Sequence, residues 1–457
     1  MKIVNPATLQ VIAEVAEDSP SMVAAKYARS RAAQPAWART PLDQRLAAIR
    51  RFRDLLIANR EELALVLTRE TGKPVKQAGN ELAAMPGRLD FFLGATAETL
   101  RDEVVWNEGT MEERIVYEPW GVVANISAWN YPYFVGSNVF VPALLAGNSV
   151  LYKPSEWATM TGQRIAALLH QAGVPEDVFI TVVGGGPAGS ALLDQPIDAV
   201  FFTGSHATGQ KIAQAVAGRL LKVQLELGGK DPTYVCPDVD VAAAAEGLAD
   251  GAFYNNGQSC CSVERIYVNR EIAEPFLQAF AQTVSGFVVG DPEAPATYIS
   301  PLARPEQLTV LEAQVKDALA KGARLLCGGK RADIPGTFPG TFEPTVLADV
   351  TGDMQVMREE SFGPIIGIQT VADDEEAVRC MNDTAYGLTA GVYTQDRARA
   401  QRILARVDAG SVYWNCCDRV SPRLPWTGRK HSGMGSTLST AGIRAFVQPK
   451  AWHLRAP

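Results

Sequence analysis

The chain has 457 residues, of which 47% are hydrophobic and 20% are charged, and its formal net charge is −7. This balance is typical of a folded globular protein and excludes intrinsic disorder, and the length predicts two or three domains. An acidic chain without a clustered basic surface is not expected to bind DNA or RNA.

The first hundred residues have mainly helical patterns. Ser19-Pro20-Ser21 is a helix start signal, and an amphipathic run opens at Pro41 and continues through Leu67. Near residues 110–120 the pattern changes, because Glu113 to Pro119 mixes β-branched with polar residues as strands do. We therefore expect helices followed by a short β segment.

From residue 121 onward, short β-branched runs alternate with helical stretches. The runs expected to form strands are 122–126, 149–153, 179–183 and 199–202. This alternation predicts a parallel sheet of the nucleotide-binding type. A second alternating region begins near Pro232 and extends to about residue 428, without a repeat or a low-complexity linker before it.

The segment from Pro119 to Tyr152 contains no charged residue, and it is longer than the ~20 residues that a bilayer requires. It also contains four asparagines, Pro132 and Pro142. Side-chain amides are costly in hydrocarbon and prolines interrupt a helix, so this pattern favours a buried segment that carries a site. No membrane is expected as a partner.

The seven cysteines and four histidines are scattered along the chain. They form no CxxC pair and no histidine pair with the spacing of metal ligands, so neither a disulfide framework nor a metal site is expected. The N-terminal sequence MKIVNPATLQ has no apolar signal core and no transit character. These features predict a reducing, cytoplasmic location.

Two glycine-rich turns follow expected strands. Gly184-Gly-Gly186-Pro-Ala-Gly189 follows one strand, and Gly204-Ser-His-Ala-Thr-Gly209 follows another. Backbone N–H groups and the Ser205 hydroxyl at such a turn can bind a phosphate. Neither turn is a GxGxxG fingerprint, so a plain structural turn remains an equal alternative.

Three residues have the chemistry of a catalytic group. Cys260, after the turn Asn256-Gly-Gln-Ser, could be a nucleophile, although most cysteines are buried and inert. Glu226 ends a β-like run, where apolar neighbours would raise the pKa of its carboxyl, or it could be a salt-bridged structural residue. Asn130 could donate to an oxyanion, or it could simply form a turn before proline.

The order of motifs along the chain closely resembles the aldehyde dehydrogenase superfamily, from Asn5-Pro-Ala-Thr to the end. The motifs are Trp129-Asn-Tyr-Pro132, Lys153-Pro-Ser-Glu156, Phe202-Thr-Gly-Ser205, Leu225-Glu-Leu-Gly-Gly-Lys230, Asn256-Gly-Gln-Ser-Cys260, Glu359-Glu-Ser-Phe-Gly-Pro364 and Arg429-Lys-His-Ser-Gly433. The resemblance implies an α/β fold with a Rossmann-type cofactor domain, an α/β catalytic domain and a small β oligomerisation arm. The implied boundaries are 1–100 and 120–227 for NAD binding, 228–428 for catalysis, and 101–119 with 443–457 for the arm.

The resemblance also implies an enzyme that oxidises an aldehyde to the carboxylic acid. Cys260 would attack the aldehyde to give a thiohemiacetal, whose oxyanion Asn130 and the Cys260 backbone N–H would hold. Hydride transfer to NAD would leave a thioester, which water activated by Glu226 would hydrolyse. A coenzyme-A-acylating semialdehyde dehydrogenase is the alternative, which the presence of Glu226 disfavours. A non-catalytic protein that retains the fold is a second alternative, which the intact catalytic set disfavours.

For the cofactor, the resemblance implies NAD, with NADP possible. The carboxylate of Glu156 would accept from ribose hydroxyls and repel a 2′-phosphate, whereas Lys153 could partly compensate. The complete set of implied cofactor contacts is Ile126, Trp129, Lys153, Glu156, Gly186, Gly204, Ser205, Glu360 and Phe362.

The implied substrate pocket is largely aromatic, with Tyr131, Phe134, Tyr254 and Trp426, and with Arg419 at its mouth or on the surface. No arginine lies in 131–140, and Tyr254 stands where succinate-semialdehyde enzymes tend to carry one. This lining suits a small to medium apolar, aromatic or amino/betaine-type aldehyde or a semialdehyde.

Two positions that carry a basic residue and a glutamate in many family members hold Val139 and Thr437 here. The proton is therefore expected to leave by another route, or through water and Glu226 alone. The family resemblance further implies a homodimer or homotetramer built through the arm.

Overall fold

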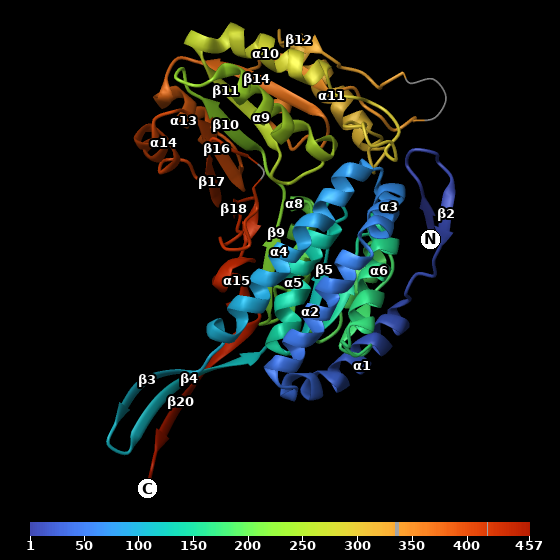
Figure 1. Cartoon of the computed structure of the whole chain (residues 1–457), viewed down its shortest axis with the longest axis vertical. Coiled ribbons are helices and arrows are strands. Elements are labelled where there is room, and N and C mark those ends of the chain that lie inside the picture. The colour runs from blue at the N-terminus through green and yellow to red at the C-terminus, as the bar shows by residue number, and fades with distance from the viewer. Residues whose placement is uncertain (334–337, 418) are drawn as a thin grey trace.

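The computed structural model describes residues 1–333, 338–417 and 419–457. The chain forms two α/β parts, each built on its own sheet, and a three-stranded arm that extends away from both (Figure 1). The predicted α/β class is confirmed.

The first sheet has six strands in the order β19-β9-β8-β5-β6-β7. Its parallel strands are β5 (Val122–Ile126), β6 (Ser149–Lys153), β7 (Phe179–Thr181), β8 (Ala199–Thr203) and β9 (Lys222–Glu226), and β19 (Gly433–Met434) pairs antiparallel with β9. Successive residues of β5 and β8 enter hydrophobic clusters on opposite faces, so the sheet is covered on both sides. This explains why its strands are continuous apolar runs in the sequence.

Helices cover both faces of the first sheet. They are α1 (Pro20–Arg39), α2 (Leu42–Ala58), α3 (Arg60–Thr71), α4 (Val75–Thr99), α5 (Pro132–Ala146), α6 (Thr159–Gln171), α7 (Gly186–Leu193) and α8 (His206–Val216). Ser19 caps α1, as its start signal predicts, by accepting from the Met22 N–H. The run that opens at Pro41 is divided at Asn59, whose side-chain amide donates to the Leu55 carbonyl where α2 ends.

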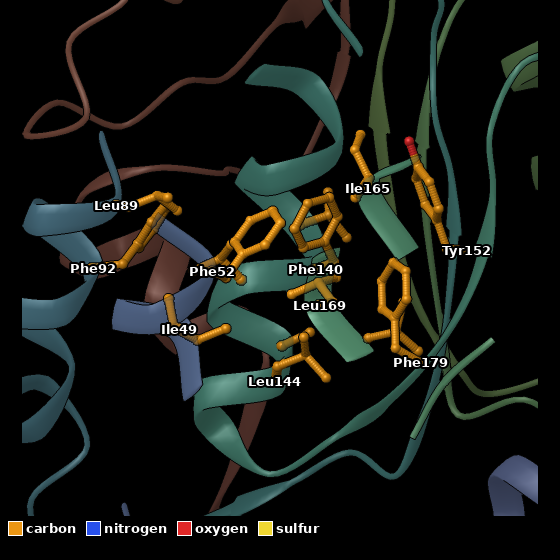
Figure 2. Close-up of a cluster of buried hydrophobic side chains, with 14 of the residues drawn as sticks. Ile49, Phe52, Leu89, Phe92, Phe140, Leu144, Tyr152, Ile165, Leu169 and Phe179 are labelled. Atoms are coloured by element: carbon orange, nitrogen blue, oxygen red, sulfur yellow. The ribbon is translucent and has the colours of Figure 1, made fainter. Parts of the chain in front are cut away.

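The uncharged segment becomes β5, α5 and β6 inside this part of the molecule. Figure 2 shows Phe140 and Leu144 of α5 between the apolar faces of α2 and α4 on one side and Tyr152 and Phe179 on the other. Within the described ranges, no helix has both the length and the apolar character needed to cross a membrane.

The second sheet has seven strands in the order β12-β13-β14-β11-β10-β16-β17. These are β10 (Asp231–Val235), β11 (Val263–Asn269), β12 (Arg324–Cys327), β13 (Thr345–Ala348), β14 (Ile365–Val371), β16 (Thr389–Tyr393) and β17 (Ser411–Trp414), and only β12 is antiparallel to its neighbour within this described sheet. Its helices are α9 (Val241–Phe253), α10 (Ala273–Ser285), α11 (Gln307–Ala320), α12 (Gln355–Arg358), α13 (Asp374–Asn382) and α14 (Arg397–Leu404).

The arm consists of β3 (Glu103–Glu108), β4 (Met111–Pro119) and β20 (Val447–Arg455), with β4 in the centre. The register pairs Val447 with Pro119 and Arg455 with Met111, so segments from distant parts of the sequence form one ribbon. Before β20, the chain passes through β15 (Tyr386–Gly387), β18 (Arg429–Lys430) and α15 (Ser439–Arg444), while β1 (Lys2–Val4) and β2 (Val11–Glu14) form an N-terminal hairpin.

Candidate active site

Cys260 follows a strained turn at the end of α9. Asn255, Asn256 and Gly257 all have left-handed backbone conformations, with φ of 54°, 58° and 68°. Asparagine and glycine tolerate this region best, and such strain persists only where the surroundings hold it. Here the Asn255 N–H donates to Gln77 Oε1 at 2.8 Å, and the Ser300 N–H donates to Asn256 Oδ1 at 2.8 Å. The turn therefore presents the half-buried Cys260 from a fixed backbone.

Asn130 is buried against this same turn. Its side-chain Nδ2 donates to the Gln258 carbonyl at 3.1 Å, two residues before Cys260. Its own carbonyl accepts from Asn255 Nδ2 at 3.2 Å and from Lys73 Nζ at 2.8 Å. The structure thus brings the predicted oxyanion donor to the predicted nucleophile, and side chains on both sides hold it there.

Glu226 is the last residue of β9 and is 6% exposed. Its Oε1 accepts from Gln224 Nε2 at 3.0 Å and from the Thr437 hydroxyl. Burial raises the pKa of Glu226 to about 7, although both hydrogen bonds and the charge of Arg88 oppose that rise. A carboxyl with this pKa can accept a proton near neutral pH.

The segment after Glu226 lies directly on the nucleophile backbone. A Cβ atom at Gly229 would come within 2.8 Å of the Cys260 carbonyl oxygen, so only glycine allows this approach. The Glu226 strand and Asn130 therefore reach the Cys260 turn from two different parts of the molecule.

A buried ion pair that the sequence reasoning missed supports Asn130. Lys73 Nζ lies 2.7 Å from Glu81 Oε2, and both side chains are almost completely buried. Glu81 Oε1 accepts from the N–H groups of Tyr133 and Phe134, at 3.0 and 3.2 Å, at the beginning of α5. A carboxylate satisfies the free N–H groups of a helix start, so this pair fixes the segment that carries Asn130. Lys73 lies between α3 and α4, and Glu81 follows eight residues later in α4, so no motif in the sequence signalled the pair.

Arg88 of α4 was also missed. Its side chain is buried, Nη1 donates to Asn138 Oδ1 at 2.5 Å, and Nη2 donates to the Val420 carbonyl at 3.3 Å. The guanidinium carbon lies 4.2 Å from the centre of the Phe134 ring. Burial lowers the pKa of Arg88 to about 10, and Glu81, Glu226 and Cys261 oppose that shift. Nothing in the surrounding segment Pro86-Gly-Arg88-Leu-Asp indicated that this arginine would be buried near the site.

The carboxyl ends of the first sheet gather the predicted cofactor residues. Ile126 ends β5, Lys153 ends β6, and Gly204 and Ser205 follow β8. The Gly204 N–H donates to the Glu226 carbonyl at 3.0 Å, while the exposed Ser205 hydroxyl caps α8 and accepts from the Thr208 N–H at 3.3 Å. Ligands of open parallel sheets bind at this edge.

Lys153 and the glycine-rich turn fit a polar ligand. Lys153 is only 5% exposed, yet its ammonium contacts are 3.4 Å to the Pro154 carbonyl and 3.9 Å to Glu156 Oε2. Burial lowers the pKa of Lys153, and the charge of Glu156 opposes this. A Cβ at Gly186 would meet nothing within 4 Å, so the space in front of this turn is open. A buried, weakly partnered amine beside open space suits ribose hydroxyls.

The remaining predicted cofactor residues, Trp129, Glu360 and Phe362, come from segments of both α/β parts. The rings of Trp129 and Phe362 meet edge to face at 5.6 Å, and Glu360 Oε1 accepts from the Gly229 N–H at 3.2 Å. A second missed ion pair, Lys230 with Glu264 at 2.5 Å, holds this loop, because Glu264 accepts from the Ser361 and Phe362 N–H groups. Elements far apart in sequence thus meet beside Gly229.

The predicted pocket residues are only partly brought together. Tyr131 and Phe134 stack at 6.3 Å, and Trp426 belongs to the hydrophobic cluster against which Phe134 and Cys260 pack. The backbone of Trp426 exchanges two hydrogen bonds with Thr437, which links the pocket to Glu226. Tyr254 Oη accepts from Asn80 Nδ2 at 3.1 Å.

Arg419 lies apart from this group. Its side chain is exposed, and its charge opposes the rise that burial causes in the pKa of Cys416. Val139 is buried in α5, within the same apolar cluster as Phe140. The predicted anion contact at the pocket mouth therefore has no geometric support, whereas Arg88 places a cation near Phe134 from α4.

Comparisons with known proteins agree with this arrangement. The model of the aldehyde dehydrogenase family matches residues 1–452. A betaine aldehyde dehydrogenase of Cereibacter sphaeroides is 35% identical, and the match covers 99% of this chain and 93% of that protein. A probable NADP⁺-dependent succinate-semialdehyde dehydrogenase of Synechocystis is also 35% identical, over 98% of both chains. The crystal structure of an NAD-dependent aldehyde dehydrogenase from Sinorhizobium meliloti superposes with a TM-score of 0.96 at 34% identity, over all of this chain and 92% of that one.

Proposed function

This chain belongs to the aldehyde dehydrogenase family, and we propose that Cys260, Asn130 and Glu226 carry out its oxidation of an aldehyde to the carboxylic acid. The observation that supports this assignment most directly is that two segments contact the turn that carries Cys260. Asn130 donates to the Gln258 carbonyl of its turn, and Gly229, three residues after Glu226, lies against its backbone. Two segments from different parts of the chain therefore meet at the backbone of the turn that carries Cys260.

Cys260 forms the covalent bond to substrate. Its thiolate attacks the aldehyde carbon, and the oxygen that becomes negative is held by Asn130 Nδ2 and the Cys260 N–H. The hydrogen bond from Nδ2 to the Gln258 carbonyl holds the Asn130 amide at the turn before substrate arrives. This preorganisation is the main source of oxyanion stabilisation.

Glu226 completes the reaction as a general base. NAD or NADP, when bound, supplies the hydride-accepting chemistry of the oxidation. The acyl group on Cys260 then leaves by hydrolysis, for which Glu226 removes a proton from water. Its pKa of about 7 leaves it partly ionised at neutral pH. Because Thr437 and Gln224 both donate to Oε1, Oε2 is the oxygen assigned to the water.

We assign the dinucleotide to the carboxyl edge of the first sheet. Lys153 and Glu156 would hold the adenosine ribose, Ser205 and the Gly186 turn would face the phosphates, and Glu360 would reach the nicotinamide ribose. The weakly partnered amine of Lys153 and the open space at Gly186 support this fit. The exposed Glu156 carboxylate favours NAD over NADP.

The substrate is proposed to be a small to medium aldehyde that enters among Tyr131, Phe134, Tyr254 and Trp426. The relatives named above are a betaine aldehyde and a succinate-semialdehyde dehydrogenase, so their own substrates carry opposite charges. The aromatic lining by itself is compatible with either charge.

We further propose that the arm, 101–119 with 443–457, joins copies of the chain into a homodimer or homotetramer. Val104, Val105, Trp106, Trp452 and Leu454 are exposed on it, which leaves apolar surface for a partner to cover. All seven cysteines are described and none of them forms a disulfide, and a thiol nucleophile fits a reducing, cytoplasmic location.

An absorbance assay for NADH tests the chemistry. Purified enzyme with NAD and a panel of aldehydes should produce NADH and free acid, and Cys260→Ala should produce neither. Glu226→Gln should form one equivalent of NADH in a burst and then stall before hydrolysis. Formation of a coenzyme A thioester instead of free acid, or undiminished turnover by Cys260→Ala, would refute the assignment.

A further inference from the structure

On the inner face of α4, the positively charged side chain of Arg88 lies beside the Phe134 ring. Arg88 is 5% exposed, and its guanidinium lies over the Phe134 ring, which packs against the same cluster as Cys260. Val420, whose carbonyl accepts from Nη2, packs against that cluster too. The charge therefore lies at the pocket and not on the outer surface of the helix.

This guanidinium forms no ion pair with any carboxylate in the described part of the chain. Its direct partners are an amide oxygen and a backbone carbonyl, which are neutral, and its buried Nε meets no acceptor among the described residues. By contrast, Lys73 and Lys230, two other buried cations near the site, each contact a carboxylate. The charges of Glu81 and Glu226 act on the guanidinium, but neither forms an ion pair with it among the described residues. Burying a charge without a directly paired carboxylate is costly, which favours an anionic ligand at this position.

We propose that Arg88 binds a carboxylate at the end of the substrate remote from the aldehyde, so that the enzyme acts on semialdehydes of dicarboxylic acids. The proposal rests on the catalytic assignment above and specifies the substrate class of that site. Asn138 Oδ1 and the face of Phe134 hold the guanidinium in one plane, and a planar guanidinium with free N–H groups can bind both oxygens of a carboxylate.

The same charge decides against a cationic substrate. A quaternary ammonium can bind to aromatic faces, but here the face of Phe134 already carries the Arg88 guanidinium. A second cation in this low-dielectric site would be repelled. Of the two substrate charges represented among the relatives, the structure therefore favours the anionic one.

Matched pairs of aldehydes test the inference. Succinate semialdehyde is compared with 4-methylpentanal, in which an isopropyl group replaces the carboxylate, and betaine aldehyde with 3,3-dimethylbutanal, in which carbon replaces the charged nitrogen. The wild-type enzyme should prefer succinate semialdehyde to its neutral partner by at least tenfold in kcat/KM. It should also prefer 3,3-dimethylbutanal to betaine aldehyde. Equal rates within either pair, or preference for betaine aldehyde, would overturn the proposal.

The variant Arg88→Gln should lower the ratio of succinate semialdehyde to 4-methylpentanal by about 10- to 100-fold, the range expected for a hydrogen bond to a charged group. Arg88→Lys should retain part of the preference, and Arg50→Gln, on the exposed face of α2, should leave it unchanged. An equal loss on both aldehydes would mean that Arg88 acts only through the fold or Glu226, and would refute specificity. If no aldehyde is oxidised even by wild type, the catalytic assignment fails instead.

A binding measurement separates recognition from turnover. Succinate and butyrate differ by a carboxylate and a methyl group at one end, and either can be titrated calorimetrically into Cys260→Ala enzyme. Succinate should bind at least tenfold more tightly, and Arg88→Gln in the same background should remove the difference. Equal affinities for the two acids would contradict the proposal independently of any activity.

Discussion

Two regions of the site differ in how completely the protein satisfies their polar groups. The nucleophile region comprises Cys260, Asn130, Glu226 and the side chains that hold them, and its amides and carboxylates have protein partners at hydrogen-bond distance. The dinucleotide edge comprises Lys153, Glu156, Gly186 and Ser205, and its amine and backbone face weak contacts or open space. Catalytic groups are thus fixed before substrate arrives, whereas donors meant for a ligand are left available.

The largest effect is expected from breaking the ion pair under Asn130. Glu81→Gln removes the carboxylate that the buried Lys73 ammonium contacts and replaces the charged acceptor at the beginning of α5 with a neutral amide oxygen. The free energy of unfolding should fall by about 3–5 kcal/mol, measured by urea denaturation. Glu61→Gln, at an exposed position of α3, is the control and should change stability little. A loss below about 1 kcal/mol would show that the nucleophile region does not depend on this pair.

Removal of the oxyanion donor should be nearly as severe for the reaction. Asn130→Ala should lower kcat by about 10²–10³-fold, because the charge on the oxygen loses a preorganised donor. Steady-state kinetics at saturating aldehyde measure this loss, and circular dichroism checks that the fold is retained. A kcat within threefold of wild type would assign the oxyanion to other groups.

A smaller, pH-dependent effect is expected at Thr437. Glu226 is active as a base only when ionised, so the hydrolytic rate should rise with pH through its pKa of about 7. The Thr437 hydroxyl stabilises the ionised form, so Thr437→Val should raise this pKa and move the rising limb of the kcat profile to higher pH. A hydrogen bond to a charged group contributes about 1.5–3 kcal/mol, which sets the upper limit of the shift.

Thr437→Ser retains the hydroxyl and should restore the wild-type profile. A profile in Thr437→Val that is lowered equally at every pH, with no displacement, would reduce Thr437 to a packing role. Either outcome shows whether the partners of Glu226 tune its proton affinity or only its position.

The smallest effect is expected at the dinucleotide edge. Glu156→Ala removes an exposed carboxylate, so thermal stability should hardly change. The ratio of kcat/KM for NADP to that for NAD should rise about tenfold, because a 2′-phosphate is no longer repelled and a ribose contact is lost. An unchanged ratio would place cofactor selection elsewhere and weaken the contrast between the two regions.

Much of the fold and the family followed from local sequence. The alternation of short apolar runs with helical stretches predicted parallel sheets, and both sheets have them, because strands buried on two faces need apolar residues at every position. Short motifs in a fixed order identified the family, which the comparisons confirm. The single amphipathic run from Pro41 was interpreted less well, since one side-chain cap at Asn59 ends a helix without disturbing its periodicity.

By itself, the sequence determined the sheet-forming segments, the family and the candidate nucleophile, base and oxyanion donor, because each depends on neighbours along the chain. Only the tertiary structure decided what surrounds them. Thr437 meets Glu226 from 211 residues away, and Arg88 meets Val420 from 332 residues away. The sequence places Arg88 in a helical segment. Whether its side chain is buried, and which charges surround it, depends on elements that only folding brings together.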